Sequence, residues 1–239
     1  MRIINWNVKW ASPKSINGAL ISQEIFKNNP DVVCITEGYE SFFQKGYTIN
    51  SSADYGYKIT PNRRKVLLWS SNPWKEVDPI GDPSLPPGRF VSGITMTSIG
   101  DIRFIGVCIP WRDAHVITGR KNRKRWEDHV TYLKGLAKIL SVSNEIPLIV
   151  IGDFNQRIPR IAQPIEIFEQ LIDSMPSKLN IATVGAIPDL NKQTIDHVAY
   201  TREIFPKKVS SLDNQHQSLE DNRVLSDHFG VIVDFEIAE

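Results

Sequence analysis

The chain has 239 residues, with 28 Lys and Arg against 27 Asp and Glu, so its formal net charge is +1. Hydrophobic residues make up 41% and charged residues 23% of the chain, as in ordinary globular proteins. These values exclude an intrinsically disordered chain, which would combine low hydrophobicity with a large net charge. They also exclude nucleic-acid binding through overall positive charge, but they allow a local basic patch.

Hydrophobic periodicity divides the chain into strands and helices. In chain order it predicts a strand over 2–8, a helix over 18–29, strands over 31–36 and 65–70, a hairpin over 90–99 and 101–109, a helix over 122–142, a strand over 147–151, a helix over 165–175, and strands over 181–184, 195–201, 207–212 and 230–237. Residues 38–62 are predicted to form a loop with one weak strand, and residues 72–88, with five prolines, an irregular excursion. We therefore expect one α+β domain over residues 1–239, with sheets packed face to face and helices outside.

The cysteines and the apolar segments bear on the cellular compartment. Cys34 and Cys108 each lie in an apolar run, so we expect two buried free thiols and no disulfide. The first residues lack the apolar stretch and the cleavage site of a signal peptide. No apolar run approaches the roughly 20 residues that span a bilayer. We therefore expect a cytoplasmic protein that does not insert into membranes.

Acidic, amide and histidine side chains gather at the ends of predicted strands, where a rigid scaffold commonly presents functional groups. They are Asn7, Glu37, Asp153, Asn155, Asp196, Asp227 and His228. Carboxylates are hard donors suited to Mg²⁺ or Mn²⁺, and a histidine oriented by an aspartate can move a proton or contact a phosphate. Each residue alone is also common as a cap or turn residue. The set as a whole therefore predicts the parts for hydrolysing a phosphate ester.

Five short segments carry a family resemblance. They are Asn-Trp-Asn-Val at 5–8, Ile-Thr-Glu at 35–37, Gly-Asp-Phe-Asn at 152–155, Ile-Asp-His-Val at 195–198 and Ser-Asp-His-Phe-Gly at 226–230. In this order they resemble the endonuclease/exonuclease/phosphatase family, which has the deoxyribonuclease I-like fold. The resemblance runs along essentially the whole chain. It implies a four-layered α/β/β/α sandwich of two mixed sheets, with helices outside and the active site at one sheet edge.

The same resemblance implies a metal-dependent reaction. Members of the family hydrolyse phosphodiesters or phosphomonoesters with Mg²⁺ or Mn²⁺. At the matching positions, Glu37 resembles the principal metal ligand, Asn7 lies beside the metal, and Asp227 resembles a further ligand or an outer acid.

The remaining matched positions carry the expected acid–base and phosphate-binding groups. Asp153 resembles the group that activates water or assists the leaving group, and Asn155 resembles a donor to a phosphate oxygen. His228 resembles the histidine that contacts the phosphate, paired with Asp196. The resemblance leaves open which of Asp153 and His228 handles the proton of the nucleophile.

The chain departs from the family pattern after the strand predicted at 101–109. Cys108 stands where a Tyr or His is usual, and Trp111 stands where repair endonucleases have an Asn. This difference argues against a close relative of the abasic-site endonucleases. Arg112 or His115 could supply the missing donor, or both could be ordinary polar surface residues.

A basic segment follows directly. Six Lys and Arg lie against one acidic residue from Arg112 to Arg125, at the start of a predicted helix. Basic residues at a helix start oppose the helix dipole, which favours contact with a polyanionic substrate over a solvated helix end. Trp111 could stack on a base. We predict substrate contacts by Trp111, Arg112, His115, Arg120 and Arg123.

These observations favour a divalent-metal-dependent phosphodiester hydrolase, and above all a nuclease, endonuclease or exonuclease, acting on DNA or RNA. The alternative is a phosphatase or phosphodiesterase of a small or lipid-headgroup phosphate ester, although the chain has no evident apolar hairpin for inserting into a membrane. A catalytically inactive binding protein is disfavoured, because the matched positions are filled except at Cys108 and Trp111. The sequence indicates no protein partner.

Overall fold

The structure is a computed structural model that describes residues 1–142, 146–217 and 222–238, and its long strands form two sheets. The first sheet runs in the order β13 (Ile204–Leu212), β16 (Gly230–Ile237), β1 (Arg2–Asn7), β2 (Val32–Tyr39), β4 (Arg63–Ser70) and β3 (Tyr47–Asn50). The second runs in the order β5 (Trp74–Asp78), β6 (Phe90–Thr97), β7 (Gly100–Cys108), β8 (Leu148–Asp153), β12 (Asp196–Thr201) and β9 (Leu179–Ile181). Both sheets are mixed, because β1 pairs in parallel with β2, and β7 with β8.

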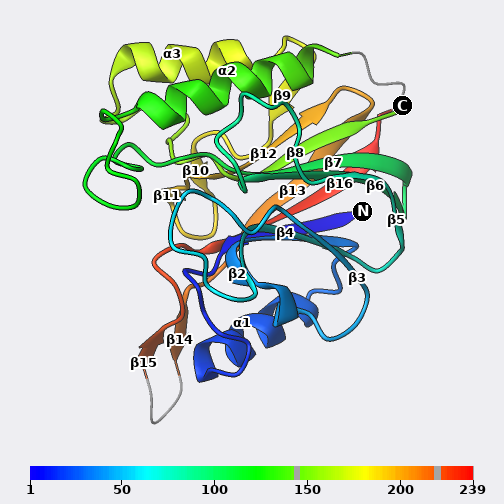
Figure 1. Ribbon diagram of the computed structural model, residues 1–239. Helices are drawn as coiled ribbons and strands as arrows, with labels where there is room; N and C mark the ends of the chain where they lie inside the picture. The colour runs from blue at the N-terminus through cyan, green and yellow to red at the C-terminus, as the bar shows by residue number, and fades with distance from the viewer. Residues whose placement is uncertain (143–145, 218–221, 239) are drawn as a thin grey trace.

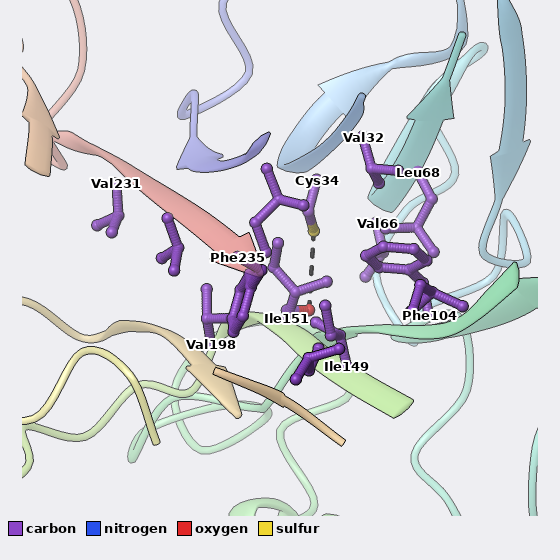
Figure 2. Packing of buried hydrophobic residues seen from close by; sticks show 14 of the residues in the cluster. Val32, Cys34, Val66, Leu68, Phe104, Ile149, Ile151, Val198, Val231 and Phe235 are labelled. Carbon is purple, nitrogen blue, oxygen red and sulfur yellow. Dashed lines mark hydrogen bonds between the residues drawn. The ribbon is translucent and has the colours of Figure 1, made fainter. Parts of the chain in front are cut away.

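The core between the sheets follows from the alternation of side chains along each strand. In β4, Val66 and Leu68 point toward the second sheet, while Leu67 belongs to the cluster on the outer face. In β7 and β8, Phe104 and Ile149 point back toward the first sheet. Figure 2 shows these side chains interleaved between the sheets. Burial of this apolar surface is the main favourable contribution to folding.

Helices cover the two outer faces (Figure 1). The helix α1 (Ile16–Phe26) begins at Ser15, whose Oγ accepts from the Gly18 N–H at 3.1 Å, and it packs on the first sheet through Ile21 and Ile25. The helices α2 (Glu127–Ser141) and α3 (Ile165–Ser174) cover the second sheet with apolar faces that include Leu136 and Leu171. The predicted four-layered sandwich is thereby confirmed. Among the described residues, no helix is long and apolar enough to cross a membrane.

The helix predicted over 122–142 is wrong at its start. Trp126 has φ of 68°, in the left-handed region, so α2 begins only at Glu127. The first turn of α2 then carries Glu127 and Asp128, as the helix dipole favours. The basic segment before it is therefore a loop, and the dipole argument for a polyanion contact does not apply.

Other differences concern short or edge strands. The strand predicted over 181–184 is β9, which ends at Ile181. The proline-rich segment 72–88 contains the edge strand β5. This strand is free to form because one of the five prolines precedes it and the other four follow it. The chain also forms the short helix η1 (Glu40–Phe42) and four short strands without a period-two signal: β10 (Ala186–Ile187), β11 (Lys192–Gln193), β14 (Gln215–Gln217) and β15 (Asn222–Val224).

Buried polar groups also join the sheets. Asn5 on β1 is fully buried, and its Nδ2 donates to the Gly152 carbonyl of β8 at 3.0 Å and to the His197 carbonyl of β12 at 3.3 Å. The Sγ of Cys34 lies 3.7 Å from the Ile151 carbonyl (Figure 2). Both cysteines are buried free thiols, as predicted, and burial raises the pKa of Cys108 to about 12. These groups fix how β1 and β2 sit over β8 and β12.

Candidate active site

Five elements bring polar groups to one edge of the sandwich. The residues are Asn7 at the end of β1, Glu37 in β2, Asp153 at the end of β8, Asp196 at the start of β12, and Asp227 and His228 just before β16. The register of β8 and β12 places Asp153 directly opposite Asp196. The first sheet therefore contributes Asn7 and Glu37, and the second contributes the two paired aspartates.

Asp153 is held from both sheets. Asn7 Nδ2 donates to its Oδ2 at 3.0 Å, and the Asn155 N–H donates to its Oδ1 at 2.9 Å. Burial raises the pKa of Asp153 to about 7, and nearby Asp196 adds to the rise, while His228 opposes it. Asn155 has φ of 55°, and its Nδ2 donates to the Ile109 carbonyl at 2.8 Å. Hydrogen bonds of Asp153 and Asn155 therefore hold the turn after β8 in place.

Asp196 and His228 form a close pair. His228 Nδ1 lies 2.5 Å from Asp196 Oδ2, and Asp196 is only 1% exposed. Burial lowers the pKa of His228, but the charge and hydrogen bond of Asp196 more than offset burial, so the pKa rises to about 10. With Nδ1 bound to Asp196, Nε2 is the nitrogen left to meet a ligand.

The two acids predicted to bind metal each have a lysine partner. Glu37 Oε1 lies 2.5 Å from Nζ of Lys65, and Asp227 Oδ2 lies 2.9 Å from Nζ of Lys9. Burial raises the pKa of Asp227, but the bond and charge of Lys9 together with the charge of His228 more than offset burial and leave the pKa below its ordinary value. Glu37 has φ of 54°, and its carbonyl accepts from the Trp10 N–H at 2.6 Å. Both acids thus carry counter-ions.

The carboxylates of this cluster suit a divalent cation, while the protonated His228 suits an anion. One side-chain atom each of Asp153, Asp196 and His228 lie within 4.8 Å of one another. Oδ1 of Asp196 is buried and has no hydrogen-bond partner among the described residues, so it can take a further ligand. This compact group is not the predicted metal set of Glu37, Asn7 and Asp227. That assignment stays a prediction.

The basic segment carries less free charge than its composition indicates. Its arginines Arg112, Arg120, Arg123 and Arg125 all form ion pairs, with acids that include Asp54, Asp113, Glu127 and Asp128. Three of these acids lie outside the segment. Asp113 and Asp128 are buried, so their pairs anchor the exposed arginines to the body of the protein and set where those side chains lie.

The structure separates the predicted substrate-contact residues. Arg112 lines a cavity that Asn155 also lines. His115, Arg120 and Arg123 line a smaller pocket, where His115 is 6% exposed and its Nδ1 accepts from the Arg120 N–H at 3.2 Å. Burial lowers the pKa of His115.

Trp111 lies just after β7 and is 41% exposed. An exposed indole at this place is compatible with the predicted stacking on a base. The contact between Trp111 and substrate stays a prediction.

Sequence reasoning missed the support beneath the turn after β8. Gln156 is 2% exposed, and its Nε2 lies 2.7 Å from His129 Nε2. His129 Nδ1 donates to the Pro110 carbonyl at 2.7 Å, so its Nε2 accepts from Gln156 and the ring is neutral. His197 Nε2 lies 3.0 Å from the Gln156 carbonyl. Burial lowers the pKa of both histidines to about 4. His197 lies in the Ile-Asp-His-Val segment at 195–198, but no sequence pattern links it to Gln156.

The fold and this cluster place the chain in a known class. The chain belongs to the endonuclease/exonuclease/phosphatase family, whose model matches residues 4–228. Members of this family are phosphoester hydrolases that generally depend on a divalent metal, so the chain is identified as a phosphoester hydrolase. No curated protein matches the sequence.

Solved structures share the fold at low sequence identity. The 3′ phosphatase NExo from Neisseria, bound to a product DNA hairpin, is 17% identical with a TM-score of 0.69, covering 99% of each chain. TDP2 of D. rerio, complexed with a single-strand DNA product, is 15% identical with a TM-score of 0.67, covering 99% of this chain and 98% of its own. A mannosyl-6-phosphatase from Bacteroides thetaiotaomicron is 15% identical with a TM-score of 0.62, covering 99% of this chain and all of its own.

Proposed function

We propose that this protein is a divalent-metal-dependent phosphodiesterase that acts as a nuclease on DNA or RNA. The observation that carries the proposal is the group of Asp153, Asp196 and His228, whose ligand atoms lie within 4.8 Å of one another at an edge of the sandwich. In such a group the carboxylates can face a cation while the histidine contacts a phosphate beside it.

The metal site in this proposal uses the acids at the edge of the first sheet as well. Glu37 would be the principal ligand, with Asn7 beside the cation and Asp227 as a further ligand. A divalent cation held there would polarise the phosphate and favour ionisation of water. To hold it, Glu37 and Asp227 would give up part of their contact with Lys65 and Lys9.

The chain's own groups handle the proton and the phosphate oxygens. Asp196 holds His228 through Nδ1 and stabilises its imidazolium, so Nε2–H donates to a phosphate oxygen. An imidazolium has no lone pair to accept a proton, and we therefore assign Asp153 to take the proton of the attacking water. Asn155 donates to a second phosphate oxygen once its bond to the Ile109 carbonyl is exchanged.

The preference for nucleic acid rests on the surroundings of the cluster. A cavity beside Asn155 is lined by Arg112 and other arginines, which suits a chain of phosphates. Two of the solved structures described above hold DNA. The mannosyl-6-phosphatase makes a small phosphate ester the main competing substrate.

The test is cleavage of labelled single- and double-stranded DNA and RNA with Mg²⁺, Mn²⁺ or EDTA. Asp153→Asn is compared with Asp173→Asn, a matched change at an exposed position on α3. We expect metal-dependent cleavage that falls at least about 10²-fold in Asp153→Asn and is unchanged in the control. Hydrolysis of a small phosphate monoester without cleavage of nucleic acid would replace the nuclease by a phosphatase. Cleavage that persists in EDTA would refute the metal dependence.

A further inference from the structure

Two neighbouring hollows lie at the candidate site. A pocket of about 120 Å³ is lined by Asp196, Asp227 and His228 among others. A cavity of about 460 Å³ is lined by Asn155 among others. Arg157 and Ile195 line both, so the two hollows meet at Arg157. A substrate held at His228 can therefore extend past Arg157 into the larger cavity.

The larger cavity is cationic. Among the residues that the structure describes, the charged ones that line it are Arg112, Arg125 and Arg157. Asp113 lies behind two of them: its Oδ2 is 3.0 Å from Arg112 Nε, and its Oδ1 is 2.7 Å from Arg125 Nε. The bond from Arg125 lowers the pKa of Asp113, so the carboxylate stays ionised. Because Asp113 engages only the Nε atoms, the terminal guanidinium nitrogens of both arginines stay outside these two bonds.

Arg157 differs from these two arginines in having no counter-ion among the described residues. Within residues 1–142, 146–217 and 222–238, no ion pair or hydrogen bond of its guanidinium is found, while Gln163 Nε2 donates to its backbone carbonyl at 2.7 Å. The preceding residue, Gln156, is buried between His129 and His197. An unpaired cation thus stands on a fixed backbone at the junction of the two hollows.

We propose that Arg157, Arg112 and Arg125 form a subsite for the phosphate next to the one that is cleaved. This inference rests on the proposed nuclease function and names the part of the substrate that the cavity takes. Guanidinium groups bind phosphate oxygens in bidentate geometry, and three of them with one carboxylate leave a net positive site.

Trp126 adds an aromatic surface to the same cavity. Its ring packs at right angles to the ring of His129, with centroids 5.0 Å apart, and its backbone N–H donates to the Arg112 carbonyl at 2.7 Å. A nucleobase can stack on such an anchored indole. The subsite therefore fits one further nucleotide of a single strand, with its phosphate at the arginines and its base at Trp126.

The test measures binding of a fluorescein-labelled ten-nucleotide DNA strand with Mg²⁺, using Asp153→Asn protein to prevent cleavage. Matched strands carry one uncharged methylphosphonate, moved one linkage at a time. We expect one position at which the neutral linkage weakens binding about 10-fold. Arg157→Gln should weaken binding of the unmodified strand by the same factor, lower the salt slope by about one, and remove the effect of that methylphosphonate.

The control is Arg202→Gln, in the exposed turn at the far end of β12, which should leave binding unchanged. Unchanged affinity in Arg157→Gln, or an equal methylphosphonate effect with and without Arg157, overturns the subsite. If the strand does not bind at all, the subsite is also overturned. Metal-dependent cleavage of nucleic acid by wild-type protein that is equally fast in Arg157→Gln refutes the subsite alone and leaves the nuclease intact.

Discussion

The pair formed by Asp196 and His228 makes a prediction that can be tested on the metal-free protein. Asp196→Asn keeps the shape of the side chain and removes its charge. The pKa of His228 stands at about 10 against an ordinary 6.5, and this rise corresponds to about 5 kcal/mol in favour of the imidazolium. Burial lowers this pKa, and Asp196 supplies the largest opposing contributions. We expect removal of the Asp196 charge to lower the pKa of His228 from about 10 to about 8 or below.

The assay is an NMR titration of the histidine ring resonances between pH 4.5 and 11. His129 and His197 are internal controls, since burial lowers the pKa of each to about 4 and neither should reach its titration midpoint in this range in either protein. The His228 resonance is assigned by its loss in His228→Gln. Under the proposed function, turnover of Asp196→Asn also falls, and most at high pH, where His228 is no longer charged.

One result would refute this reasoning. If His228 titrates at the same pH in wild type and Asp196→Asn, the 2.5 Å contact does not control its charge. An ordinary value near 6.5 in the wild-type protein would contradict the pairing itself. A lowered pKa with unchanged turnover would keep the pairing and refute the role assigned to the imidazolium.

Two further predictions concern stability. Burial lowers the pKa of His129 to about 4, so protonation favours the unfolded chain: stability falls as pH drops below about 6.5, and the cost reaches about 2 kcal/mol at pH 5. In urea unfolding, the free energy of unfolding of His129→Gln should fall by about 2 kcal/mol less than that of wild type between pH 6.5 and 5. An equal fall in wild type and variant would contradict the prediction. Gly152 has φ of 145°, and an added Cβ would lie 1.9 Å from the Val107 carbonyl oxygen, so Gly152→Ala should cost at least about 2 kcal/mol and displace Asp153. Gly185→Ala, with φ of 84° but open space, should cost about 1 kcal/mol, and equal losses in the two variants would remove the steric argument.

The sequence predicts those parts of the fold and site that follow from local patterns. A short apolar run such as Val66, Leu67 and Leu68 marks a strand that is buried on both faces, and the polar residues that follow such strands mark one sheet edge. The five short motifs, taken in their order along the chain, then indicate the family. The predicted start of α2 was wrong because Trp126, a single residue in the left-handed region, interrupts a helical hydrophobic pattern that otherwise continues.

The parts that could not be predicted depend on contacts between distant segments. The partners of the basic loop include Asp54 and Asp128, which stand outside it, so counting charge within the segment overstates what is free. The lysine partner of Glu37 lies on β4, and nothing in the spacing of Lys65 indicates it. The sequence likewise does not indicate that Arg157 lines both the pocket at His228 and the larger cavity beside it.

The division of the candidate site between two sheets links catalysis to the packing of the core. Asn7 on one sheet holds Asp153 on the other, and Asn5 reaches from the first sheet to the Gly152 carbonyl. Any change that slides or spreads the sheets therefore moves these acidic groups relative to one another. Enlarging or trimming Phe104, a residue of the core between the sheets, should therefore act on turnover as well as on folding. We therefore expect turnover to change with substitutions that alter the spacing between the two sheets.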